Sequence, residues 1–137
     1  MKKYLNVSLI YAVAAMIGGV FYREFTKFNS FDGVTVLGKV HTHLFLLGMI
    51  TFLIVALFAG KLALKEQKVF RVFMIVYNIG VSLTAVMMVI RGIVQVLGVS
   101  LSSGQSASIS GIAGIGHIMT GIGIILLIIS LKKAEEA

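Results

Sequence analysis

The chain has 137 residues, of which 58% are hydrophobic and 12% are charged, and its formal net charge is +7. Soluble domains carry about 25% charged residues, so this composition and a mean hydropathy of +1.04 exclude an ordinary soluble protein and indicate a membrane protein. The absence of cysteine excludes disulfide bonds, thiolate metal sites and covalently attached c-type heme. The basic residues cluster beside apolar segments, a pattern that indicates membrane topology and no nucleic-acid partner.

Four apolar segments are long enough to cross about 30 Å of hydrocarbon as helices. In chain order they cover residues 4–22, 40–60, 72–90 and 109–131. The stretch GVSLSSGQSASIS before the last segment has Ser and Gly at turn density and predicts a loop. The first segment starts like a signal peptide, but its apolar part before Ala12 is short, so we expect a retained helix. The sequence predicts an all-α fold, a single-domain integral membrane four-helix bundle over residues 1–137.

The Lys and Arg residues that flank these segments predict the orientation of the bundle. Eight lie on one side: Lys2, Lys3, Lys61, Lys65, Lys68, Arg71, Lys132 and Lys133. Four lie on the other: Arg23, Lys27, Lys39 and Arg91. We therefore expect both termini to be cytoplasmic and the second and fourth helices to run inward, in a multi-pass protein of the bacterial cytoplasmic membrane.

The three histidines are predicted at comparable depth, in the outer half of the bundle. His41 and His43 open the second helix, about 200° apart on a regular helical wheel, and His117 lies about two turns into the fourth. The stripe through His41 includes the small residues Gly48 and Ala56 and favours helix contact. The stripe through His43 is bulky and favours lipid or a cofactor edge: Leu46, Leu47, Ile50, Ile54 and Phe58. His117 shares its face with Ser110, Gly114 and Gly121, which leave room for a flat group.

Imidazoles inside apolar segments are usually functional, and heme b would account for these. We expect one heme in the outer half, with His41 and His117 as axial ligands or one of them opposite an open position. His43 is the alternative ligand, a hydrogen-bonding neighbour or a residue that reaches the membrane interface. Arg91 and Arg23 are expected either to pair with the propionates or to anchor the helices at the interface. Tyr22 is expected to hydrogen-bond a ligand or to belong to the aromatic belt.

Such a heme suits electron transfer, with a quinol as redox partner, or gas and redox sensing. An alternative is a zinc or copper site of His41, His43, His117 and Glu24, with hydrolase activity, which requires an irregular first turn in the second helix. Glu24 also has a plainer role in pairing with Arg23 or Lys27. A further alternative is a structural or transport protein without a cofactor. No catalytic residue is assigned, and the glycine-rich faces are compatible with a homodimer.

The segment HTHLFLLGMI resembles the second-helix signature of the heme-copper oxidase superfamily, in particular the nitric oxide reductase and cbb-type oxidase catalytic subunits. That resemblance implies that His41 occupies the position of the heme b ligand and that His43 replaces an Asn. Those subunits need further histidines for their binuclear centre, so oxygen or nitric oxide reduction is not expected here. With its blocks GGVFYREFTKF, IRGIVQVLG and SISGIAGIGHIMTGIGI, the whole chain resembles a short four-span bacterial family of unknown function, common in Gram-positive organisms.

Overall fold

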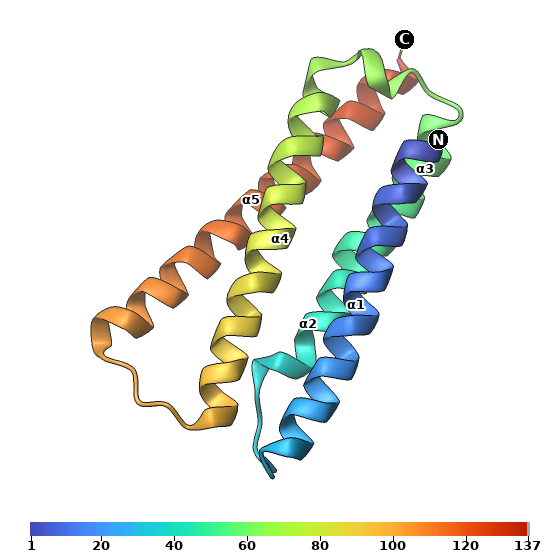
Figure 1. Ribbon diagram of the computed structural model, residues 1–137. Helices are drawn as coiled ribbons and strands as arrows, with labels where there is room; N and C mark the ends of the chain where they lie inside the picture. The colour runs from blue at the N-terminus through green and yellow to red at the C-terminus, as the bar shows by residue number, and fades with distance from the viewer. Residues whose placement is uncertain (137) are drawn as a thin grey trace.

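The computed structural model describes residues 1–136, which form helices joined by short connections (Figure 1). Four helical spans are long and apolar enough to cross a membrane: α1 (Lys2–Phe28), a composite second span (Val36–Ala59), α4 (Lys68–Leu97) and α5 (Ser103–Glu135). No strand occurs in the described range. The all-helical, four-span prediction is confirmed. The start of α1 and the end of α5 lie at the same end of the bundle, and we call the opposite end the distal end (Figure 1).

The second span is not the regular helix that the sequence predicted. It begins with the 3-10 turn η1 (Val36–Lys39) and the short α2 (Val40–His43), widens into the π-helix η2 (Leu44–Ile50) and ends as α3 (Thr51–Ala59). Gly48, in the π-helix, lies so close to the Tyr11 ring of α1 that a side chain there would collide with it. π-turns are rare in helices and often mark functional positions.

Side chains from three elements stabilise the backbone carbonyls of the π-helix. The Tyr77 hydroxyl on α4 donates to Leu47 O at 2.8 Å, and the Ser8 hydroxyl on α1 donates to Met49 O at 2.8 Å. The Thr51 hydroxyl donates to Leu46 O at 3.2 Å. A buried carbonyl without a partner is costly in an apolar environment, so these hydrogen bonds help to explain how the bundle tolerates the widened turn.

The predicted loop before the last span is wrong for most of its length. α4 ends at Leu97 and is capped by Gly98, whose positive φ of 62° is easily adopted only by glycine, and α5 already begins at Ser103. The Ser102 side chain accepts a hydrogen bond from the Gln105 backbone N–H, and the Gln105 side chain accepts one from the Ser102 N–H. This Ser-x-x-Gln capping box starts a helix, and its two residues stand within the stretch that the Ser and Gly content assigned to a loop.

The four spans associate as two pairs, with α4 in a central position. α1 packs against the second span, α5 packs mainly against α4, and α4 also contacts η1, α2 and η2 (Figure 1). Towards the distal end α5 diverges on the side of α4 that faces away from α1 (Figure 1). The η3 turn (Leu64–Glu66) connects the two pairs at the end that holds the termini.

Reciprocal glycine and threonine contacts join α4 to α5. A Cβ added at Gly80 would lie 2.6 Å from Thr120 N, and one added at Gly116 would lie 2.7 Å from Thr84 Oγ1. Each helix thus carries a glycine followed four residues later by a threonine, and the glycine of one helix contacts the threonine of the other. Small residues at this spacing let membrane helices approach closely, and van der Waals packing then supplies the association energy.

Candidate functional site

His41 is half-buried and packs against α1. A Cβ at Gly19 would lie 3.6 Å from both Cβ and Cγ of His41, so the imidazole fills the space that this glycine leaves. Its Nδ1 is buried and has no hydrogen-bond partner within residues 1–136. Gly48, Phe52 and Ala56, which share the predicted contact stripe, are buried, and that part of the sequence prediction is confirmed.

His43 points away from the contact stripe, and its ring is oriented by its own helix. Its Nδ1 lies 2.9 Å from Lys39 O, and a carbonyl can only accept, so Nδ1 carries the proton and donates. Leu46, Ile50, Ile54 and Phe58 on the same side are 40–60% exposed, as predicted for the outward face. Leu47, the fifth residue of that stripe, is instead half-buried and packs against the core. In the neutral ring, the lone pair of His43 is therefore on Nε2.

His117 is exposed on α5, about 100° around the helix from Gly116, which contacts α4. Its Nδ1 donates a 2.8 Å hydrogen bond to Ala113 O, which again leaves the lone pair of the neutral ring on Nε2. Gly114 and Gly121 lie about one turn to either side, and nothing lies within 4 Å of a Cβ built at either. The open space that the sequence predicted beside His117 is present.

The structure does not bring the predicted ligands together within one protomer. His41 contacts α1, His117 is exposed on α5, and α4 lies between α5 and the second span (Figure 1). His41 and His43 both lie in α2, a short α-helical turn between the 3-10 turn η1 and the π-helix η2, so the irregularity that the zinc or copper site requires does not fall between the two histidines. Within residues 1–136 no group of three or more His, Asp or Glu side chains is placed to hold a metal ion.

The predicted propionate partners differ in their surroundings. Arg91 bridges from α4 to α5: its guanidinium donates to Ser106 Oγ at 3.2 Å, Ser106 O at 3.1 Å and Ser110 Oγ at 2.6 Å. Arg23 is 83% exposed, with Nε 3.9 Å from Glu24 Oε1, the plainer pairing expected for that carboxylate. Tyr22 packs on Gly38, where an added Cβ would lie 3.0 Å from its Cζ. Of these three residues, only Arg91 reaches the helix that carries His117.

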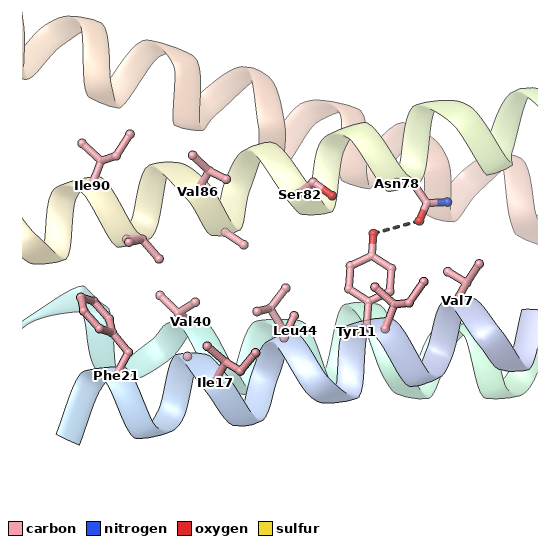
Figure 2. Close-up of a pocket in the computed structure, with 15 residues that line it drawn as sticks. Val7, Tyr11, Ile17, Phe21, Val40, Leu44, Asn78, Ser82, Val86 and Ile90 are labelled. Carbon is pink, nitrogen blue, oxygen red and sulfur yellow. Dashed lines mark hydrogen bonds between the residues drawn. The ribbon is translucent and has the colours of Figure 1, made fainter. Parts of the chain in front are cut away.

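A groove lies between α1 and α4. It has a volume of about 710 Å³ and an almost wholly apolar lining from α1, α2, η2 and α4 (Figure 2). The Tyr11 hydroxyl crosses it to donate a 2.9 Å hydrogen bond to Asn78 Oδ1, and Ser82 lies one turn further along α4 (Figure 2). None of the histidines lines this groove. The sequence shows Asn78 and Ser82 as isolated polar residues in an apolar span, but it does not show that they face a groove.

The comparisons with known proteins give a family and no function. No curated protein and no solved structure matches the chain, and the resemblance to heme-copper oxidases is not shown by these comparisons. One family model, described as "Protein of unknown function (DUF2871)", matches residues 1–134. This match covers nearly the whole chain, as the resemblance to a short four-span family predicted. The chain therefore belongs to the DUF2871 family.

Proposed function

We propose that this protein binds heme b in the membrane and that His117 is the axial ligand. The observation that carries the proposal is the state of this imidazole: Nδ1 donates to Ala113 O, and the ring is exposed between two glycines with open space above them. Histidines that ligate metals through Nε2 commonly donate Nδ1–H to a carbonyl, which fixes the tautomer and the ring orientation. An exposed imidazole in a lipid-facing position is otherwise costly, and a bound macrocycle would cover it.

Arg91 supports the same site as the partner of a propionate. Its guanidinium bonds to Ser110, seven residues before His117 and on the same helical face, about 10 Å away along the axis at 1.5 Å per residue. A porphyrin whose iron lies at His117 can extend its propionates over that distance towards the distal end. Within residues 1–136 the one ion pair is between Arg23 and Glu24, so no carboxylate of the described chain neutralises Arg91.

This arrangement gives one axial ligand in each protomer. The short oxidase-like motif would make His41 the heme ligand. His41, however, packs against Gly19 on α1 and cannot reach the face of α5 that carries His117. Heme with a single imidazole supplies an open coordination position, which suits gas or redox sensing. In this proposal the chain orients the imidazole through Ala113, leaves a flat surface at Gly114 and Gly121, and supplies a cation through Arg91.

Absorption spectroscopy of the detergent-purified protein, oxidised and dithionite-reduced, tests the proposal. We expect a Soret band and, after reduction, a spectral change on addition of carbon monoxide, which needs an open position. His117→Ala should abolish the band, whereas Ile118→Ala, at an exposed neighbour 64% accessible, should keep it. His41→Ala should also keep it. Absence of porphyrin absorption after incubation with hemin, or a band lost with His41 and kept without His117, would contradict the proposal.

The site faces the outside of the cell if the termini are cytoplasmic, as we also propose, in a bacterial plasma membrane. The eight-to-four distribution of basic residues supports this orientation. Because the chain has no cysteine, single cysteines introduced at Ser100 and Ala134 can be labelled without background. A membrane-impermeant maleimide added to intact cells should label the Ser100→Cys variant and spare Ala134→Cys, and the reverse pattern would invert the topology.

A further inference from the structure

The groove between α1 and α4 has the size and lining of a site for a small lipophilic molecule. Its volume of about 710 Å³ lies within the range of about 300–1,000 Å³ that is usual for ligand sites. Its wall includes residues with substantial exposure, Ile17 at 64%, Val86 at 54% and Ile90 at 39%, so the groove is open along one side. In a bilayer, a molecule dissolved in the lipid could therefore enter sideways without crossing the headgroup region.

Three polar side chains lie along this groove near the middle of the membrane, where the surrounding lipid tails have no polar groups. Tyr11 is two residues from residue 13, the midpoint of the apolar segment 4–22, and Ser82 is one residue from residue 81, the midpoint of 72–90. Asn78 stands one turn from Ser82 and accepts the Tyr11 hydrogen bond (Figure 2). Polar side chains at mid-membrane are costly and mark functional positions more often than lipid contacts.

Hydrogen-bond donors remain available at these groups. One N–H of the Asn78 amide donates to Met74 O at 2.6 Å, and the amide carries a second N–H. Ser82 lines the groove on α4 near the Tyr11–Asn78 hydrogen bond, and its hydroxyl can turn to donate (Figure 2). The groove therefore offers two donors to an acceptor atom at mid-depth, with apolar walls that run from them to Phe21 and Ile90 at the distal end.

We infer that this groove binds an isoprenoid quinone, whose ring carbonyl accepts from Ser82 and Asn78 and whose tail follows the apolar wall. A phospholipid fits less well because its polar atoms lie at the membrane surface and its acyl chain has no acceptor at the depth of Ser82. Heme does not fit this groove because its lining includes no His or Met to ligate iron. The site is separate from His117, which is exposed on α5, on the other side of α4.

The test is a binding titration of the full chain in phosphatidylcholine nanodiscs with a benzoquinone and a naphthoquinone, each with a two-isoprene tail. The chain has no tryptophan and four tyrosines, so quenching of tyrosine emission reports an occupant near Tyr11. We expect saturable quenching with one quinone per chain. Ser82→Ala should weaken binding about fivefold, the effect of one lost hydrogen bond, and Ser108→Ala, an exposed serine on α5, should not.

A second pair of variants tests the groove itself. Val86→Phe fills the groove from a partly exposed position and should reduce affinity at least tenfold, whereas Val72→Phe, 47% exposed on the same helix outside the groove, should leave it unchanged. Equal affinity in the two phenylalanine variants, or native mass spectra that show retained phospholipid and no quinone, would overturn the inference. Neither readout depends on heme. A protein that shows no Soret band but binds quinone would refute only the heme proposal, and a protein that binds heme but no quinone would refute only this inference.

Discussion

The hydroxyl of Tyr11 donates a 2.9 Å hydrogen bond to Asn78 Oδ1, and this bond joins α1 to α4 across a mostly apolar groove. The same two helices contribute Ser8 and Tyr77, whose hydroxyls bond to carbonyls of the π-helix. The hydroxyls of Tyr11 and Tyr77 therefore connect the first helical pair to the second, and Ser8 connects the two spans of the first pair. Variants that lose a single hydroxyl distinguish these connections from the packing around them.

Tyr11→Phe should lower the free energy of unfolding by about 0.5–1.5 kcal/mol, because it removes one interhelical hydrogen bond in the membrane and keeps the ring. Unfolding in mixed micelles by titration with SDS, followed by circular dichroism, measures this change. Tyr4→Phe is the matched control: Tyr4 is also buried, and its ring packs edge-on against Phe70, but its hydroxyl makes no hydrogen bond within residues 1–136. Equal effects at the two positions would show that the bond to Asn78 contributes nothing.

Tyr77→Phe should destabilise the protein by about 1–3 kcal/mol, more than Tyr11→Phe. The Tyr77 hydroxyl donates to Leu47 O in the π-helix at 2.8 Å and lies 3.2 Å from Thr51 Oγ1, so its loss leaves a carbonyl of the widened turn without that donor. Hydrogen exchange of amides 44–51 gives an independent measurement, because local opening of the π-helix should accelerate it. Unchanged exchange in this segment would contradict the role assigned to Tyr77.

Gly80→Ala should destabilise the α4–α5 pair by about 1–3 kcal/mol, because the added methyl group would lie 2.6 Å from Thr120 N. Gly111→Ala adds the same methyl group to α5 where nothing lies within 4 Å, and it should be neutral or mildly stabilising. Thermal unfolding of the two variants in one detergent distinguishes them. Similar midpoints would mean that the two helices are not in close contact at Gly80.

Arg91→Gln should loosen the distal ends of α4 and α5, since the guanidinium makes the hydrogen bonds to Ser106 and Ser110. Spin labels on cysteines introduced at Leu97 and Ser103 should report a broader distance distribution than in the parent protein. Arg23→Gln removes a charge from a side chain that is 83% exposed and should leave that distribution unchanged. A narrow distribution in both variants would show that the Arg91 bridge does not hold the helix ends.

Gly114→Leu should abolish the expected heme absorption while the fold remains intact, because the new side chain covers the open face beside His117 and contacts no other helix. Gly104→Leu is the control, since Gly104 is equally open but lies in the first turn of α5, far from His117. The Soret absorbance per protein and the circular dichroism spectrum together provide the measurement. Heme retained in Gly114→Leu at the level of Gly104→Leu would place the cofactor elsewhere.

Much of the candidate site was predictable because its signals are local. The helical period placed His41 on the contact stripe and His43 on the exposed one, and the burial of Phe52 and the exposure of Ile54 agree. The glycines around His117 indicated open space, which is present. The prediction that His41 and His117 converge rested on their similar depth in the membrane. Depth does not show which helices are neighbours, and in the structure α4 lies between α5 and the second span.

The π-helix was not predictable from the periodicity of the second span. Its composition reads as one continuous apolar helix, and its widening involves Tyr77 and Ser8, which are distant in sequence. The early start of α5 was predictable in principle, because Ser102 and Gln105 have the spacing of a capping box. There the Ser and Gly content indicated a loop, and the specific pair of side chains was the better signal.

By itself the sequence determined that this protein has four apolar helices able to span a membrane, and which face of the second span is buried, because hydropathy and helical period are properties of neighbouring residues. The tertiary structure decided that α4 separates His117 from His41, that Arg91 on α4 bonds to serines of α5, and that Tyr11 meets Asn78 across a groove. These relationships depend on how closely two helices approach. That distance is set by contacts such as Gly80 with Thr120, between residues on different helices.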